Sequence, residues 1–418
     1  AEYQLSELAL APKAIAGSVA AGLHLREPPR EETVSAAAYQ YYVQGVYYLR
    51  RDPESGDEAI RFFDKAVELD PTSPLPYAGL AEAQLQNHRR KKGKSWLDLA
   101  RSSLSKAEAR NPDSVPVRLV AGLLKQTLGS YEEAADDFKR AIELDPKSGE
   151  GRRRLAYLYQ KLNKPGDALK TYRRAIEVES SYYRPYVDLA GFYYAQAQYM
   201  EADEQYRKVL EIAPELPAGH NGRGVALMEM ARYPEAEKEF RAALRVRESP
   251  YYLNNLGALL AYLERDAEAA ELYQRAIDKG APSNILYLNL GDSQRRLNRR
   301  AEAESAYRKG LDMGDTDLLQ DPWDGLARAT VAYACERLGD HKRAEMEIAQ
   351  AVKFLPHDAV VQRLAVQTYE TLGKREKSLE ILALARPALL SALSRHPDLA
   401  GLRQDPRFVE RLTRTPGK

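Results

Sequence analysis

The sequence has little of what several classes of protein require. Its single cysteine, Cys335, excludes an intramolecular disulfide and leaves the redox compartment open. No apolar run approaches the roughly 18–20 residues that a membrane-spanning helix needs. Basic and acidic residues number 62 and 61 in a chain of 418, and this balance argues against a protein dedicated to nucleic acid, which needs a basic face.

Catalytic and cofactor-binding patterns are also missing. The six histidines are scattered, with no cysteine or histidine partner at metal-ligand spacing. The stretch GHNGRG at 219–224 is superficially similar to a phosphate-binding loop but falls inside an expected helix. Cys335 has no base supplied to it, so we interpret it as a buried structural thiol. The sequence therefore predicts no enzyme, no cofactor and no metal site.

What the sequence has instead is a period of about 34 residues. A small residue recurs at a fixed place, a larger side chain follows it after four positions, and a second small or slender residue comes three positions later. The recurring small residues are Ala59, Ala100, Ala134, Ala168, Ala202, Ala236, Ala269, Ala303, Ala344 and Ser378.

This pattern resembles the tetratricopeptide repeat family over roughly residues 36–386. The resemblance implies an all-α fold, an α-solenoid in which about ten helix-turn-helix units form a right-handed superhelix. The spacing supports that interpretation independently, because Leu253, Leu256 and Leu260 fall on one face of a helix. One helix pair cannot bury its own apolar face, so neighbouring pairs must stack.

The ends of the chain differ from the middle. We expect a helical lead-in and linker over 1–35, the repeat array over 36–386 and a capping segment over 387–418. The first repeat and the tail HPDLAGLRQDPRFVERL are similar to the ends of repeat arrays in bacterial multidomain signalling proteins. Because the chain begins with Ala and shows no signal-peptide pattern, we interpret it as a fragment or a processed product.

Two intervals of 41 residues mark insertions into the array. The first, around 86–96, is interpreted as a solvated loop, with docking of an acidic partner or phosphates by its basic residues as the alternative. The second, around 315–324, is expected to extend the link into the ninth repeat. Trp323 within it is expected to pack locally, and anchoring a partner is the alternative.

The resemblance also implies where a partner binds. In the family, the first helix of each repeat lines the concave surface. Tyrosine and arginine commonly anchor interfaces, and asparagine can pair with both groups of a peptide backbone. Carried onto this chain, the family's register predicts these peptide-binding residues in the fourth to eighth repeats: Arg153, Tyr157, Arg184, Tyr194, Asn221, Asn254, Tyr262 and Arg296. Asn255 and Asn289 stand where the array of O-linked GlcNAc transferase carries an asparagine ladder.

These features predict a non-catalytic scaffold that binds a protein or peptide partner in the groove of the superhelix. The alternative is the regulatory or sensory C-terminal region of a bacterial signalling enzyme, a protein kinase or nucleotide cyclase whose catalytic domain is absent here. We expect no nucleic-acid partner and no membrane insertion by this chain, and self-association stays open. A cytoplasmic location is predicted, with the periplasmic part of a membrane-anchored bacterial protein as the alternative.

Overall fold

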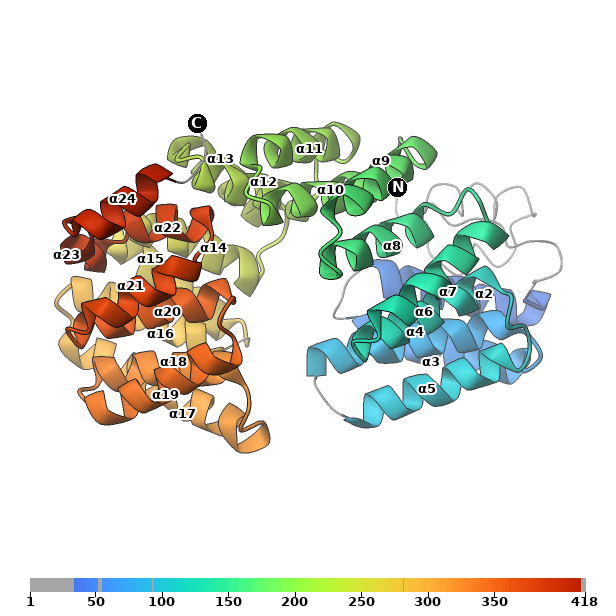
Figure 1. Cartoon of the computed structure of the whole chain (residues 1–418). Helices are drawn as coiled ribbons and strands as arrows, with labels where there is room; N and C mark the ends of the chain where they lie inside the picture. The colour runs from blue at the N-terminus through green and yellow to red at the C-terminus, as the bar shows by residue number, and fades with distance from the viewer. Residues whose placement is uncertain (1–33, 52–54, 92–93, 281, 415–418) are drawn as a thin grey trace. The chain divides into compact units, whose positions relative to one another are not determined.

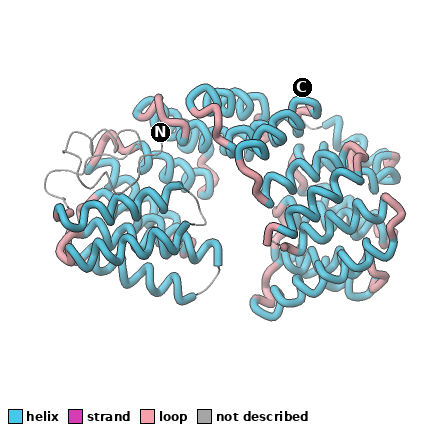
Figure 2. The backbone as a smooth tube through the Cα atoms, turned by 180° about the vertical axis from the view of Figure 1, so that it is seen from behind, coloured by secondary structure: helices cyan, strands magenta, loops and turns pink. Residues whose placement is uncertain are grey.

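The computed structural model describes residues 34–51, 55–91, 94–280 and 282–414. Within these ranges every regular element is a helix and no strand occurs, as Figure 2 shows. The chain divides into two compact units, Ala1–Phe192 and Tyr193–Lys418. The predicted helical lead-in falls on residues 1–33, which lie outside the described part. None of the described helices is long and apolar enough to cross a membrane.

Consecutive helices pack as pairs joined by short turns (Figure 1). The N-terminal unit contains α2 (Ala36–Arg51) with α3 (Gly56–Leu69), α4 (Pro74–Lys91) with α5 (Lys94–Glu108), α6 (Val115–Thr127) with α7 (Tyr131–Leu144), and α8 (Gly149–Lys161) with α9 (Pro165–Val178). Helix α10 (Arg184–Ala195) runs across the boundary between the units and precedes α11 (Tyr199–Ile212).

The C-terminal unit continues in the same way. Its further pairs are α12 (Pro217–Glu229) with α13 (Tyr233–Val246), α14 (Pro250–Tyr262) with α15 (Asp266–Asp278), α16 (Asn284–Arg296) with α17 (Arg300–Gln320), α18 (Gly325–Arg337) with α19 (His341–Phe354), and α20 (Ala359–Thr371) with α21 (Arg375–Leu384). The predicted all-α array of helix pairs is therefore confirmed.

The recurring small residues lie in the interior. All ten are buried, each with at most 3% of its surface exposed. The larger side chains four positions later are buried as well, except Tyr206, which is partly exposed. The register that the sequence predicted is thus the register of the core.

An aromatic ring of the second helix lies directly against the backbone of the first in several pairs. A methyl group added to Gly257 of α14 would lie 2.8 Å from Cε1 of Tyr273 on α15, closer than real carbon atoms approach. A methyl group on Gly224 would likewise lie 2.8 Å from the ring of Phe240. The glycines of GHNGRG therefore belong to helix α12, where Gly224 admits an aromatic ring. The same contact recurs at Gly122–Phe138 and Gly291–Tyr307.

The turns inside the pairs share a left-handed residue. Glycine takes this conformation at Gly129 and Gly339, with φ of 83° and 89°, since it has no Cβ to clash. Ala231 and Glu264 adopt φ of 59° at the equivalent turns without that freedom. A non-glycine residue costs roughly 1–2 kcal/mol there, so helix packing, rather than the local sequence, imposes the turn.

The first insertion is largely helical, which corrects the predicted solvated loop at 86–96. Helix α4 continues to Lys91 and α5 begins at Lys94. Asn87 is buried, and its Nδ2 donates a hydrogen bond to Oδ1 of Asp57 at 2.8 Å. The inserted residues therefore lengthen a helix that packs on its neighbour.

The second insertion also lengthens a helix, since α17 continues to Gln320. Trp323 follows it with 73% of its surface exposed. Its ring centroid lies 5.3 Å from that of Phe354, so the indole has a local aromatic contact on one side and solvent on the other.

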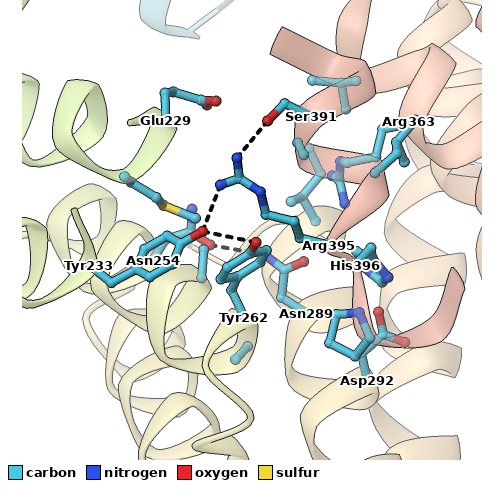
Figure 3. A pocket seen from close by; sticks show the side chains of 18 of the residues that line it. Glu229, Tyr233, Asn254, Tyr262, Asn289, Asp292, Arg363, Ser391, Arg395 and His396 are labelled. Carbon is cyan, nitrogen blue, oxygen red and sulfur yellow. Dashed lines mark hydrogen bonds between the residues drawn. The ribbon is translucent and has the colours of Figure 1, made fainter. Parts of the chain in front are cut away.

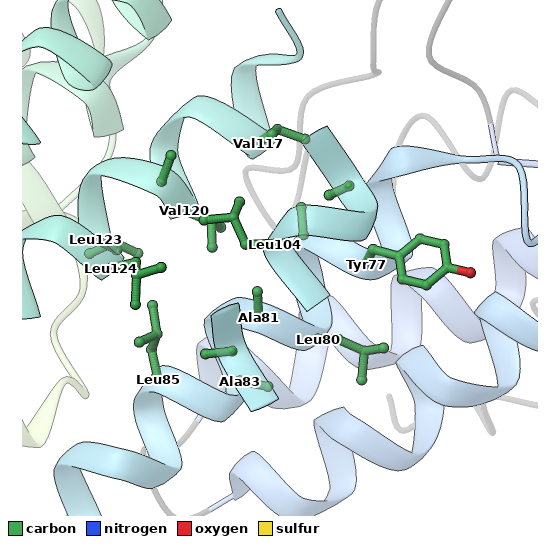
Figure 4. Close-up of a cluster of buried hydrophobic side chains, with 14 of the residues drawn as sticks. Tyr77, Leu80, Ala81, Ala83, Leu85, Leu104, Val117, Val120, Leu123 and Leu124 are labelled. Atoms are coloured by element: carbon green, nitrogen blue, oxygen red, sulfur yellow. The ribbon is translucent and has the colours of Figure 1, made fainter. Parts of the chain in front are cut away.

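The core of the N-terminal unit is formed by first and second helices alike (Figure 4). Leu80 and Leu85 of α4 join Leu104 of α5 with Val120 and Leu124 of α6 in one cluster of buried side chains. Helices α4 and α5 thus both contact α6 of the next pair, as stacking of amphipathic pairs requires.

The array of the C-terminal unit ends in a capping segment, which we define as residues 387–414. It contains α22 (Pro387–Ser394), a 3₁₀ turn (Pro397–Leu399), α23 (Ala400–Arg403) and α24 (Pro406–Arg414). Buried apolar side chains attach it to the core of the last helix pairs: Leu389, Leu390, Leu393, Leu399, Leu402 and Phe408. Helix α22 contacts α20 and also α12, far earlier in the chain. The capping segment therefore joins helices that are not neighbours in the array.

The contact between Gly257 and Tyr273 generates a test of the register. We expect Gly257→Ala to lower the free energy of unfolding by roughly 1–3 kcal/mol, because the added methyl group overpacks the ring of Tyr273. The measurement is chemical denaturation followed by circular dichroism.

Gly191 in α10 provides the matched control, since no atom beyond its chain neighbours and the adjacent backbone of its own helix lies within 4 Å of the position its Cβ would take. Gly191→Ala should leave stability unchanged or raise it by up to about 1 kcal/mol through helix propensity. Equal effects of the two substitutions would contradict the close contact.

Candidate functional site

A cavity of about 360 Å³ lies within the C-terminal unit. Its walls come from α12 to α16, from α20 and from the capping segment, as Figure 3 shows. The apolar part of the wall includes Ala258, Ala261, Ile285 and Val360. The polar part combines amides, tyrosine hydroxyl groups, two carboxyl groups and three guanidinium groups. The capping segment thereby turns a surface between helix pairs into a cavity.

Asparagine side chains connect the first helices beside this cavity. Nδ2 of Asn289 donates to Oδ1 of Asn254 at 3.1 Å, and both residues line the cavity. Nδ2 of Asn255 donates to Oδ1 of Asn221 at 2.9 Å. Each bond orients two amides. The bond between Asn289 and Asn254 leaves Nδ2 of Asn254 to donate and Oδ1 of Asn289 to accept, because an asparagine carries both donors and an acceptor.

Two tyrosines and an arginine form a chain of hydrogen bonds at the cavity (Figure 3). Nη1 of Arg395 donates to the hydroxyl oxygen of Tyr233 at 2.7 Å, and that hydroxyl donates to Tyr262 at 3.1 Å. The rings of Tyr233 and Tyr262 are 5.3 Å apart in a tilted arrangement. Arg395 comes from the capping segment, 162 positions after Tyr233.

The two carboxyl groups of the cavity are engaged by tyrosine hydroxyl groups. Asp292 accepts hydrogen bonds from Tyr307 and Tyr333, both at 2.8 Å. Glu229 accepts one from Tyr194 at 3.2 Å. Burial raises the pKa of Glu229 above its ordinary value, which weakens its preference for the charged form.

Asp398 anchors the capping segment to the wall of the cavity. Its Oδ2 lies 2.5 Å from Nη2 of Arg295, 3.2 Å from Nη2 of Arg337 and 3.7 Å from Nη1 of Arg296. Burial alone would raise the pKa of Asp398, but the hydrogen bond from Arg295 and the charges of Arg295 and Arg337 hold it below its ordinary value. The carboxylate is therefore charged at neutral pH and fixes the segment.

His396 lines the cavity next to this anchor. Its Nδ1 accepts a hydrogen bond from the backbone N–H of Asp398 at 3.2 Å, and its Nε2 lies 2.9 Å from the amide nitrogen of Gln367. Burial lowers the pKa of His396 to about 4, although Asp398 and Asp292 oppose that shift. The imidazole is therefore neutral near pH 7 and caps the turn at Pro397–Leu399.

The structure brings three of the predicted peptide-binding residues together. Asn254, Tyr262 and Arg296 all line the cavity. Tyr194 does not line it but supplies the hydrogen bond to Glu229, which does. Asn221 is only 4% exposed and serves Asn255, so its side chain is part of the helix contact.

The other three predicted residues belong to the N-terminal unit. Nη1 of Arg153 donates to Oδ2 of Asp188 at 2.6 Å. Tyr157 is 37% exposed, with the ammonium group of Lys161 5.3 Å from its ring centroid. The guanidinium of Arg184 lies 5.8 Å from the ring centroid of Tyr183.

Two arginines of the cavity wall were not among the predicted residues, Arg363 and Arg395. The period contains the signal for Arg363, because it precedes Ser378 by the same interval of 15 residues that separates Asn254 from Ala269. The repeat period could not predict Arg395, because the capping segment lies outside the repeats.

The structure also shows the surroundings of Cys335 and of the residue types that bind metal ions. Cys335 in α18 is 2% exposed, and burial raises the pKa of its thiol to about 11, far from the range of a reactive thiolate. Across the described ranges, no group of three or more His, Cys, Asp or Glu side chains is placed to hold a metal ion.

Comparisons with known proteins identify the repeats of this chain. Tetratricopeptide repeat models match residues 92–149, 221–284 and 288–359, and related models with the same description match 126–183 and 183–216. No curated protein matches the chain.

Several solved structures are similar to this chain. The human IFIT1 dimer with PPP-AAAA is 18% identical, with a TM-score of 0.51 over 82% of this chain and 78% of that one. PilF of Pseudomonas aeruginosa is 23% identical, with a TM-score of 0.42 over 47% and 89%. A tetratricopeptide repeat protein of Parabacteroides merdae is 17% identical, with a TM-score of 0.43 over 62% and 99%. At this identity the likeness to IFIT1 shows a shared fold.

The low pKa of His396 generates a prediction about acid stability. In the unfolded chain the imidazole titrates near its ordinary value of about 6.5. Between that pH and about 4, the unfolded state binds a proton that the folded state excludes, so stability falls as the pH falls. We expect acidification from pH 7.5 to 5 to cost the native chain roughly 1–2 kcal/mol more than it costs His396→Asn.

Asparagine is the matched variant because it keeps an acceptor for the N–H of Asp398 and does not titrate. The measurement is urea unfolding at both pH values. Equal losses in the two proteins would show that His396 does not contribute to the acid response.

Proposed function

Because this chain belongs to the tetratricopeptide repeat family, whose arrays serve protein interactions, we propose that it is a non-catalytic scaffold that holds a short extended segment of a partner protein. The proposed site is the cavity of the C-terminal unit. The observation that carries the proposal is that Asn254, Tyr262 and Arg296, predicted from the repeat register to face a ligand, line one cavity.

The chemistry of the walls suits an extended peptide. An extended segment offers unpaired backbone N–H and C=O groups. Nδ2 of Asn254 can donate to such a C=O, and Oδ1 of Asn289 can accept from such an N–H. Ile285 and Val360 offer apolar contact to a side chain. The ring of Tyr262 adds a rigid surface whose burial has a low cost in conformational entropy.

The dimensions restrict the occupant. Ligand pockets in proteins measure roughly 300–1,000 Å³, and this cavity lies at the lower end with about 360 Å³. A cavity of that size accepts a few side chains of an extended segment and excludes a folded domain. The partner is therefore recognised through a short linear stretch.

The polar groups of the cavity support binding rather than catalysis. The hydroxyl groups of Tyr307 and Tyr333 occupy the carboxylate of Asp292, and His396 is held by Gln367 and the backbone of Asp398. A nucleophile needs an adjacent base within hydrogen-bond reach, and no serine, threonine or cysteine of the cavity wall has one in these contacts. We accordingly expect no turnover of esters or phosphoesters.

The finer predictions from the sequence belong to the same proposal. Because both ends resemble arrays of bacterial signalling proteins, the alternative is that this scaffold is the regulatory region of a protein kinase or nucleotide cyclase. A cytoplasmic location and the absence of a nucleic-acid partner stay predictions as well. Gene context upstream of this sequence tests the setting independently of the cavity.

Tyr262→Ala tests the site. Peptides selected on the full chain from a displayed library of random 12-residue sequences serve as probes. We expect the variant to bind the selected peptides 5- to 150-fold more weakly, corresponding to roughly 1–3 kcal/mol for the loss of a central aromatic anchor. The measurement is fluorescence anisotropy with labelled peptide.

Tyr251→Ala is the matched control, since Tyr251 lies on the same helix α14, is 62% exposed and does not line the cavity. It should bind the peptides as the native chain does. If no peptide is selected, or if both variants keep native affinity, the cavity is not the binding site.

A further inference from the structure

The arginines of the cavity wall differ in whether a carboxylate neutralises them. Arg296 lies 2.8 Å from Asp266 through its Nε and also approaches Asp398. Its neighbours Arg295 and Arg337 both contact Asp398. These three guanidinium groups are therefore compensated within the fold.

Arg363 of α20 has no such partner. Its Nη1 lies 3.5 Å from Oε1 of Gln367, which is longer than a normal N–H···O hydrogen bond. In the described part of the chain, no carboxylate oxygen lies within 4 Å of its guanidinium. Arg363 thus brings to the cavity a positive charge that no nearby carboxylate neutralises.

Arg395 is held only by neutral oxygen atoms. Its Nη1 donates to Tyr233 at 2.7 Å and its Nη2 donates to Oγ of Ser391 at 2.9 Å, as Figure 3 shows. These contacts fix the guanidinium at the cavity without neutralising it. Among the described residues no carboxylate forms an ion pair with Arg395.

The carboxyl groups inside the cavity form no ion pair with these two arginines, although the charge of Arg395 acts on Glu229. Asp292 is committed to two tyrosine hydroxyl groups and lies 3.5 Å from Nε of Arg337. Glu229 is bound by Tyr194, and burial raises its pKa although that hydrogen bond and the charge of Arg395 oppose the shift. The cavity therefore combines the charges of half-buried Arg363 and exposed Arg395 with apolar and amide surface.

We propose that the segment bound in this cavity carries an acidic side chain, Asp or Glu, whose carboxylate pairs with Arg363 and Arg395. The inference rests on the proposed function and specifies its ligand. A planar guanidinium binds a carboxylate through two parallel hydrogen bonds, and the partial burial of Arg363 strengthens its attraction to an anion. The apolar wall at Ile285 and Val360 then receives a neighbouring apolar residue of the same segment.

A phosphorylated side chain presents the same anionic chemistry to two guanidinium groups. The experiment therefore includes three forms of one selected peptide, with glutamate, glutamine or phosphoserine at the position in question. A clear preference for glutamate or phosphoserine over glutamine supports an anion site and identifies its source.

The first expected result concerns the composition of the selected peptides. Random 12-residue peptides selected on the full chain should be enriched in Asp and Glu relative to the input library. The enrichment should disappear on the double variant Arg363→Gln/Arg395→Gln. Glutamate-to-glutamine replacement in a selected peptide should weaken binding to the native chain at least 10-fold and binding to the double variant by less than 2-fold.

The melting temperature of the double variant shows whether the two arginines act in recognition or in the stability of the fold. Arg363 and Arg395 have no ion pairs to lose among the described residues, and the two hydrogen bonds of Arg395 are exposed, so the double variant should melt close to the native temperature. Arg308→Gln is the control, since Arg308 lies on α17 and does not line the cavity. It should leave peptide affinity unchanged.

Two outcomes would overturn the inference in distinguishable ways. If selected peptides depend on Tyr262 but show no acidic enrichment and bind the double variant with native affinity, the cavity binds peptides without an anion. If the double variant loses binding together with a large drop in melting temperature, the arginines act through stability rather than recognition.

Discussion

An aromatic ring seated on a glycine of the facing helix sets the spacing on which the array depends. Tyr273 against Gly257 and Phe240 against Gly224 leave no room for a single methyl group. Each contact holds two helices at a short distance, and the buried alanines around it keep that distance constant along the array. The first helices consequently stand in register, which is why Asn289 can reach Asn254 and Asn255 can reach Asn221 across adjacent pairs.

The capping segment changes the shape of the surface that the first helices present to a ligand. In an ideal solenoid each unit contacts only its neighbours, and binding occurs on an extended surface. Here α22 contacts both α20 and α12, and Arg395 reaches Tyr233. The segment is fixed by buried leucines on one side and by the ion pairs of Asp398 on the other. A surface between helix pairs thereby becomes a cavity that Arg296, Arg363 and Arg395 line.

The sequence predicted local features well and distant ones poorly, for a physical reason. Ala269 and Tyr273 recur with the period because helix pairing is a local constraint, so the fold and the register were predictable. Asn254, Tyr262 and Arg296 followed from that register. The division of the chain between Phe192 and Tyr193 leaves no trace in the period. The contact of Arg395 with Tyr233 depends on how four intervening helix pairs accumulate their rotation, which no local pattern encodes.

The reach of the capping segment from α20 back to α12 also constrains how this protein can evolve. Repeat arrays commonly change length by gaining or losing whole units, and an open array tolerates such changes because each unit meets only its neighbours. In this chain the pairs between α12 and α20 act as a spacer of fixed length. Duplication or deletion of one of them would move Arg395 and Asp398 away from their partners on α13, α16 and α18. Selection on the cavity would therefore act against changes in the number of repeats.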